Sequence, residues 1–546
     1  MQSAPPPDTR SVDADVASRR EPEPFAYDQL RYPGLPFDQT HPGRLATLAV
    51  LHGMEPAPPA RCRVLELGCG DGGNLIPLAY QYPDSAFVGI DLSARAIETG
   101  RKTVADLALH NIELRPLDIA ALTPDDGRFD YIIAHGVYSW VPEPVREKIL
   151  SVFRANLAPQ GIAFVSYNCY PGSYMRDLSR AIMLFHVRRN ADPKERVQQA
   201  RLLLQMLAEA SNEDIYGYVL KSQHERVRKT QDTVLYHDDL DEGAKAFFLY
   251  QVVEAAAQHG LQYLCDSYTP ILTGPLMELQ REASPLVKFL EQIPEQEWLA
   301  REQYWDFARG RMFRDMLLCQ KEIELRRPVA ASRIANLQVC AELMPETADL
   351  DPQASGPAEF KTRAGKRITT DHRLSKAALI HLGAIWPRTI GVAELATAAL
   401  ARLGPASETV QQYLDREIEG LSAILFRSFC AGVVEIEAFP LPLAATVSER
   451  PQASLLARKQ AQSGSLLTNL RHDSVLVEDA VTLRLISLLD GTRTLDQLVC
   501  DLAAAGAQVV RQNGASPDAA SAAPIISREN VMGNVQRLAK LALLIA

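Results

Sequence analysis

The sequence predicts an α/β protein that begins with a doubly wound sheet, because short apolar segments alternate with helical segments over residues 62–166. Such alternation is typical of parallel βαβ units. After about residue 190, long helical periodicity replaces the alternation. Beyond residue 366, helices are mixed with short β-like runs. We therefore expect a sheet domain, then a helical domain, then an α+β domain.

The chain has 546 residues, which is too long for one core when a domain typically has roughly 100–200 residues. The first 24 residues are rich in proline and charged side chains, so we expect a disordered tail. A run rich in Ala, Ser and Pro at 514–524 is expected to be a mobile loop. We expect the sheet domain at 25–190, the helical domain at 191–342, a linker at 343–366 and the α+β domain at 367–546.

The apolar patterns place individual elements within these domains. Helices are expected at 73–81, 93–109 and 143–157, with another beginning at Pro42 and a helical block at 288–325. Parallel strands end at one edge of their sheet, and ligands bind there. The expected strands are Arg63–Leu67, Ala86–Ile90, Ile112–Pro116, Tyr131–Ala134 and Ala163–Ser166.

A glycine-rich loop, Glu66-Leu67-Gly68-Cys69-Gly70-Asp71-Gly72, follows the first expected strand. Glycine lets the backbone turn sharply and approach a ligand closely. The spacing differs from the GxGxxG pattern of dinucleotide sites, where a pyrophosphate lies at a helix N-terminus. A carboxylate such as Glu66 would repel a pyrophosphate but suits a cation. The loop therefore favours S-adenosylmethionine, which carries a sulfonium and no phosphate, over NAD.

Acidic side chains follow the next two strands. Asp91 can accept hydrogen bonds from both ribose hydroxyls, a feature that NAD sites share. Asp118 can accept from the exocyclic amine of adenine while Ile119 packs on the ring. The fourth strand runs out to His135 at the predicted methyl end of the cofactor. An Asp at the end of a strand is also often only a helix cap. The prediction of S-adenosylmethionine therefore depends on the glycine loop and these acidic residues taken together.

Two aromatic clusters flank the predicted methyl end, at 137–142 and 167–172. Burial among aromatic rings lowers the pKa of an amine, and aromatic faces accommodate an alkylammonium product. The Asn168 carbonyl oxygen can orient an amine. An Asn/Asp-Pro-Pro-aromatic motif is absent after the fourth strand, so the choice between nitrogen and oxygen acceptors stays open, as does simple core packing of the aromatic rings. The candidate catalytic residues are Tyr138, Trp140, Asn168 and Tyr170.

Over residues 60–170 this constellation resembles the class I S-adenosylmethionine-dependent methyltransferases. The resemblance implies a seven-stranded Rossmann-like sheet. It also implies a cofactor pocket lined by Glu66, Gly68, Gly70, Asp91, Leu92, Asp118, Ile119 and His135.

Further segments are similar to bacterial methyltransferases that carry a methyltransferase regulatory domain, a group that includes lysine methyltransferases of an outer-membrane surface protein. The group implies a helical middle domain, a winged-helix-like C-terminal domain, a homodimer and a protein lysine acceptor. The segments are Thr40–Thr47, Ser166–Gly172, Leu235–Leu240, Gln303–Phe307 and Arg311–Cys319. Thr40 and His41, in the first of them, are added to the predicted cofactor-binding residues.

Bulk properties narrow the function classes. The net charge of −10 argues against general binding of nucleic acid, which needs a basic face. The eight cysteines are scattered and lack metal-ligand spacing, so we expect no metal site and a reducing compartment. We see no signal peptide and no apolar run of membrane-spanning length, and we therefore expect a cytoplasmic enzyme without membrane insertion. A small-molecule N- or O-methyltransferase and a cofactor-sensing adaptor without activity remain the alternatives.

The predicted ribose contact can be tested at Asp91. We expect Asp91→Ala to weaken binding of S-adenosylmethionine by about 1–3 kcal/mol, the range for hydrogen bonds lost from a charged group. Isothermal titration calorimetry measures this change directly. Unchanged affinity would remove Asp91 from the site.

Overall fold

The computed structural model describes residues 34–267, 285–404, 410–441, 443, 447–512 and 526–545. The expected disordered tail at 1–24 and the expected mobile loop at 514–524 lie outside the described residues.

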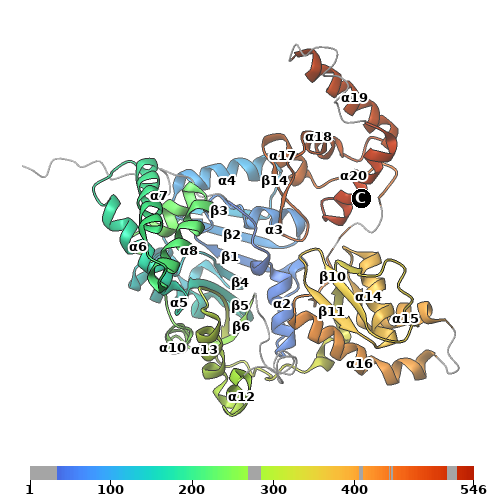
Figure 1. Ribbon diagram of the computed structural model, residues 1–546, viewed down its shortest axis with the longest axis horizontal. Helices are drawn as coiled ribbons and strands as arrows, with labels where there is room; N and C mark the ends of the chain where they lie inside the picture. The colour runs from blue at the N-terminus through green and yellow to red at the C-terminus, as the bar shows by residue number, and fades with distance from the viewer. Residues whose placement is uncertain are drawn as a thin grey trace, which may run out of the picture.

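A seven-stranded sheet with the order β3-β2-β1-β4-β5-β7-β6 organises the first part of the chain (Figure 1). Its five parallel strands confirm those expected from the sequence. The two remaining strands run antiparallel to their neighbours, β7 to β5 and β6 to β7. The strands are β1 (Arg63–Leu67), β2 (Ala86–Asp91), β3 (Ile112–Pro116), β4 (Phe129–Ala134), β5 (Leu157–Asn168), β6 (Leu261–Asp266) and β7 (Phe313–Gln320).

The last two strands come from the region in which we expected helices. Within the expected helical block at 288–325, helix α13 (Trp298–Arg309) is present, but β7 replaces the helix over Phe313–Gln320. All but the first residue of β7 are buried, because the strand is covered on both faces. A strand covered on both faces has no alternating pattern and resembles a buried helix in sequence. The domain boundaries themselves remain predictions.

Helices cover both faces of the sheet. The helices α2 (Pro42–Leu51), α3 (Leu75–Gln81) and α4 (Ala94–Asp106) share one hydrophobic core with it. The helices α5 (Glu143–Asn156) and α10 (Leu249–Gln258) share the core of the opposite face. These helices confirm those expected, including the start of α2 at Pro42. His41 caps α2, because its Nδ1 accepts a hydrogen bond of 3.0 Å from the backbone N–H of Gly43.

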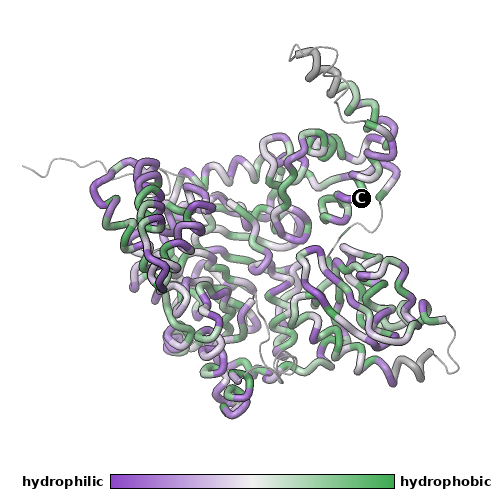
Figure 2. The backbone as a smooth tube through the Cα atoms, in the orientation of Figure 1, coloured by the Kyte–Doolittle hydropathy of each residue, from purple (hydrophilic) through white to green (hydrophobic). Residues whose placement is uncertain are grey.

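A helical arm follows the sheet strand β5. It contains α6 (Ser173–Val187), α7 (Pro193–Ala210) and α8 (Ile215–Lys229), which pack around a core of their own. Many hydrophilic residues lie along α7 and α8 (Figure 2), as expected for helices that bury only one side. The carboxylate of Asp239 is fully buried and lies 2.9 Å from Arg176 and 2.8 Å from Arg226, which ties the following π-helical turn (Leu235–Asp239) to α6 and α8.

Two separate hydrophobic cores lie beyond the sheet, one within 329–438 together with Leu51 of α2, and one within 447–544. The first contains α14 (Arg373–Ile385), α15 (Val392–Leu403) and α16 (Val410–Cys430). The second contains α17 (Leu455–Ser463), α18 (Ala480–Leu488), α19 (Leu495–Gln512) and α20 (Arg528–Lys540). The sequence suggested one domain for this region, but each group of helices encloses its own apolar residues.

Residues 343–366, expected to be a linker, contain two short strands. Strand β9 (Leu343–Pro345) pairs with β10 (Ala358–Thr362), and β10 also pairs with β11 (Arg367–Thr370). Phe360 of β10 is fully buried in the first C-terminal core. Within the described ranges, no helix is both long and apolar enough to cross a membrane.

Candidate active site

The glycine loop leaves the carboxyl end of β1 in a left-handed backbone conformation. Gly68 and Gly70 have φ values of +73° and +56°. A Cβ at Gly68 would lie 2.6 Å from Cγ2 of Val137, whereas a Cβ at Gly70 would meet nothing within 4 Å. The loop is therefore tightly packed on one side and open on the other, where a ligand can approach the backbone.

Asp91, at the end of β2, holds this loop. Its Oδ2 accepts a hydrogen bond of 2.8 Å from the backbone N–H of Gly70, and its Oδ1 accepts one of 2.8 Å from that of Ser93. The side chain therefore fixes the loop in addition to the predicted ribose contact. Each carboxylate oxygen has more than one lone pair, so the second role remains compatible with the first.

Glu66 lies beneath the loop and is 4% exposed. Its Oε1 accepts a hydrogen bond of 2.9 Å from Nδ2 of Asn74, whereas Oε2 has no hydrogen-bond partner among the described residues. Burial, together with the charges of Asp91 and Asp71, raises the pKa of Glu66 to about 8. A buried carboxylate oxygen without a partner is costly unless a ligand satisfies it. The residues around the loop therefore fit a cationic cofactor.

The other predicted cofactor residues follow the ends of β2, β3 and β4. Asp118 is exposed and caps a short 3-10 turn, because its Oδ1 accepts from the N–H of Ala120 at 2.8 Å. Ile119 is 8% exposed, and Leu92 is 58% exposed. The ring of His135 stacks on Phe37 at 3.9 Å, and burial lowers its pKa to about 4, so this histidine is neutral at pH 7.

Thr40 and His41 are buried, at 0% and 5% exposure. The Thr40 hydroxyl lies within hydrogen-bond distance of Asn74, and His41 Nε2 lies 3.3 Å from the hydroxyl of Tyr82. Their direct contact with the cofactor stays a prediction.

His472, from the second C-terminal core, completes this buried network. Its Nε2 donates a hydrogen bond of 2.8 Å to Oδ1 of Asn74, and the residue is 1% exposed. Its φ of +62° lies in the left-handed region, which histidine tolerates better than most side chains. The neighbouring Arg471 pairs with Glu435 and Glu437 of the first C-terminal core. A contact across 398 residues had no local signal in the sequence.

The predicted acceptor residues fall into two environments. Tyr138 is 3% exposed and packs in the core against Tyr167 and Phe247, with ring centroids 6.2 Å and 5.5 Å away. These contacts fit the core packing that the sequence left open, and the catalytic role of Tyr138 stays a prediction. Trp140 is half-buried and Asn168 is buried at the end of β5.

Tyr170 lies in an exposed aromatic group. Its ring stacks on Tyr174 at 4.1 Å, and its hydroxyl donates to Oδ2 of Asp177 at 2.8 Å. Burial and Asp177 raise its pKa to about 12, so the phenol stays protonated at neutral pH. Tyr170 can therefore contribute a ring face but no phenolate. Among the described residues, no three His, Cys, Asp or Glu side chains converge as a metal would require.

Three segments of the sequence match known families. Residues 64–161 match a methyltransferase domain, residues 231–320 match a predicted methyltransferase regulatory domain, and residues 449–543 match the PKMT C-terminal winged helix domain. The expected winged helix is thereby confirmed, and it coincides with the second C-terminal core alone.

Relatives from Rickettsia extend the likeness over most of the chain. The uncharacterized protein RP028 of Rickettsia prowazekii is 36% identical over 242 residues, which cover 44% of this chain and 97% of that protein. RP789 of the same organism is 37% identical over 322 residues, 59% of this chain. The chain spans only 57% of the length of RP789.

The solved structure of PKMT2 from Rickettsia typhi superposes with a TM-score of 0.81 and 27% identity, covering 94% of this chain and all of that one. The same protein has been solved in complex with AdoHcy, with a TM-score of 0.77. The chain belongs to the S-adenosylmethionine-dependent methyltransferases that carry this regulatory domain. S-Adenosylmethionine is therefore the cofactor, and the methyltransferase regulatory segment includes both antiparallel strands of the sheet.

The raised pKa of Glu66 in this methyltransferase predicts that cofactor binding releases a proton. At pH 7 the carboxyl of the free protein is largely protonated, whereas a bound cation favours the carboxylate. Affinity for S-adenosylmethionine should therefore rise between about pH 6.5 and pH 8, with release of up to about one proton per site. Calorimetry in two buffers of different ionisation enthalpy measures the proton count. Glu66→Gln should abolish the difference between buffers, and equal heats for the wild type would contradict the prediction.

The His472 contact predicts that the winged-helix domain contributes to cofactor affinity. His472→Asn keeps a residue that tolerates the left-handed backbone but shortens the side chain, so Asn74 loses a buried donor. We expect affinity for S-adenosylmethionine to fall by roughly 1–2 kcal/mol. Tyr80→Phe is the matched control, because it removes a hydrogen bond of 2.9 Å to Leu455 at the same interface without touching Asn74. An equal loss in both variants would show general loosening of the interface instead.

Proposed function

We propose that this methyltransferase transfers the methyl group of S-adenosylmethionine to the side-chain amine of a protein lysine. The observation that carries the proposal is the likeness to PKMT2 over 94% of the chain, because the abbreviation is that of protein lysine methyltransferases. The match includes the regions beyond the sheet domain that a small-molecule methyltransferase does not need.

When bound, the cofactor supplies an electrophilic methyl group on a sulfonium. The lone pair of the lysine nitrogen forms the new N–C bond as the C–S bond breaks and its electron pair stays on sulfur. The residues of this chain contribute alignment and charge. Glu66 balances positive charge beneath the loop, Gly70 leaves the backbone open, and Asp91 holds the loop in place.

An exposed aromatic surface beside the end of β5 supports a macromolecular acceptor. We call it the aromatic surface, and it comprises Tyr170, Tyr174, Phe248, Tyr304 and Phe307. The rings of Phe248 and Phe307 lie 5.9 Å apart, and those of Tyr304 and Phe307 lie 6.0 Å apart. Tyr174 is 55% exposed and Phe307 is 47% exposed. Exposed aromatic rings are enriched in surfaces that bind proteins.

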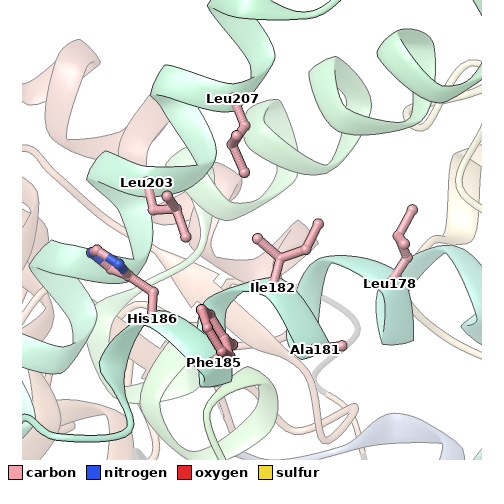
Figure 3. A pocket seen from close by; sticks show the side chains of 7 residues that line it. All are labelled: Leu178, Ala181, Ile182, Phe185, His186, Leu203 and Leu207. Carbon is pink, nitrogen blue, oxygen red and sulfur yellow. The ribbon is translucent and has the colours of Figure 1, made fainter.

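We also propose the homodimer that the family resemblance implies. A groove of about 470 Å³ lies between α6 and α7, and Figure 3 shows its apolar lining, with Leu178, Ile182 and Phe185 on α6 and with Leu203 and Leu207 on α7. Phe185 is 68% exposed. Exposed apolar side chains of this density mark contact surfaces, and a second copy of the chain is the partner that the resemblance suggests.

The acceptor is tested by incubating the protein with methyl-tritiated S-adenosylmethionine and total bacterial envelope protein. We expect label in protein, and acid hydrolysis should release it as methylated lysine. Asp91→Ala, assayed at the same cofactor concentration, should label less because its cofactor binding is weaker. Label recovered only in small metabolites would overturn the protein acceptor and favour the small-molecule alternative. Cofactor binding without any transfer would favour the adaptor.

A further inference from the structure

Asp315 lies on β7 at the height of the predicted methyl end. Its backbone pairs with that of Ser166 on the antiparallel neighbour β5. Directly opposed residues of antiparallel strands point to the same face of the sheet, so the two side chains are neighbours. Ser166 Oγ in turn accepts a hydrogen bond of 2.8 Å from the backbone N–H of Gly136, which follows β4. Asp315 is thus one strand away from the segment that begins with His135.

The carboxylate of Asp315 is buried without a counter-charge of its own. The residue is 6% exposed, and Oδ1 has no hydrogen-bond partner among the described residues. Asp266, at the same edge of the sheet, is by contrast paired with Arg311 at 2.6 Å. A buried, unpaired carboxylate costs free energy that an incoming cation can offset.

The charged groups around Asp315 do not neutralise it. Asp38 and Asp266 are acidic and raise its pKa, while Arg44 and Arg311 lower it. Arg311 already binds Asp266, and Arg44 donates through Nε to the carbonyl oxygen of Ser267 at 2.9 Å. His135, which follows β4, is kept neutral by burial, because burial lowers its pKa to about 4. Burial dominates the balance and raises the pKa of Asp315 to about 7.

Aromatic side chains connect the start of β7 with the segment that follows β4. Phe313, two residues before Asp315, is 39% exposed, and its ring lies 6.3 Å from that of His135. His135 is in turn stacked on Phe37. A ligand that fits these surroundings has an alkyl chain to pack on the rings and a cationic end to meet the carboxylate. A lysine side chain has both.

We propose that Asp315 binds the ε-ammonium of the acceptor lysine and removes one of its protons. The inference rests on the proposed lysine acceptor. The proton passes from Nζ to a carboxylate oxygen of Asp315, which leaves the nitrogen with the lone pair that attacks the methyl group. The same burial that makes Asp315 more basic makes the lysine amine less basic, so the two groups approach each other in proton affinity.

The test uses Asp315→Asn in the full-length protein and measures methyl-lysine formed in envelope protein from methyl-tritiated S-adenosylmethionine. Asparagine has nearly the same shape, and no ion pair is lost, so the fold should hold. We expect the rate near pH 7.5 to fall by about 100-fold or more, the usual loss for a general base. Affinity for S-adenosylhomocysteine, measured by calorimetry, should stay within about twofold, since Asp315 does not hold the cofactor.

A pH profile distinguishes proton removal from a structural role. Free lysine amines have a pKa of about 10.4, so raising the pH to about 9.5 supplies more neutral amine without a base. The loss in Asp315→Asn should therefore shrink at high pH relative to the wild type, and Asp315→Glu should retain more activity than Asp315→Asn. Glu322→Gln is the matched control, because Glu322 is an exposed acid that follows the far end of β7.

Each result separates this inference from the proposed function. If the wild type forms methyl-lysine and Asp315→Asn forms it equally fast, the role of Asp315 is overturned while the lysine acceptor stands. A loss that is the same at both pH values would also overturn proton removal. If the wild type labels no lysine, the lysine acceptor falls, and the inference falls with it.

Discussion

The side chain of Asn74 connects three distant parts of the chain around the glycine loop. Its amide nitrogen donates to Glu66 and Thr40, and its amide oxygen accepts from His472 and from the backbone of Phe37. Every one of these groups except Phe37 is at least nine-tenths buried. Because buried polar groups are expensive when unsatisfied, the segment before α2 and the winged-helix domain are both needed to complete the network. The surroundings of the glycine loop are therefore built by the winged-helix domain as well as by the sheet domain.

The antiparallel position of β7 is a second constraint with a functional consequence. Strand β7 enters the sheet at the edge where the parallel strands end, since Phe313 pairs with Asn168 at the end of β5. Residues at the start of β7 therefore reach the ligand edge, although they lie about 250 residues after the glycine loop in the sequence. The match to the regulatory domain covers both antiparallel strands, so this segment helps to build the sheet as well as the helices beside it.

Local patterns predicted the five parallel strands, the glycine loop and the nature of the cofactor, because each depends on residues close in sequence. Asp91 was identified at a strand end, but its hydrogen bond to Gly70 was not, since strand pairing brings the two together. The core packing of Tyr138 was left open, because an aromatic residue after a strand looks the same in sequence whether it packs inward or outward. No local pattern in the sequence indicated the roles of His472 and Asp315 or the division of the C-terminal region into two cores. Their roles arise from contacts between segments hundreds of residues apart or from a strand buried on both faces.

The two buried carboxyl groups, Glu66 and Asp315, address the electrostatic difficulty of the proposed reaction. A sulfonium and an ammonium must approach within a few ångströms, and two unit charges 4 Å apart repel by about 4 kcal/mol at an effective dielectric constant near 20. Both carboxyls have raised pKa values, about 8 and about 7, so each is partly neutral when alone and becomes an anion as a cation arrives. On this proposal, each cation is matched by its own carboxylate on the same face of the sheet. The free protein then avoids holding two fully charged, uncompensated anions in its interior, and each carboxyl ionises as its own cation binds.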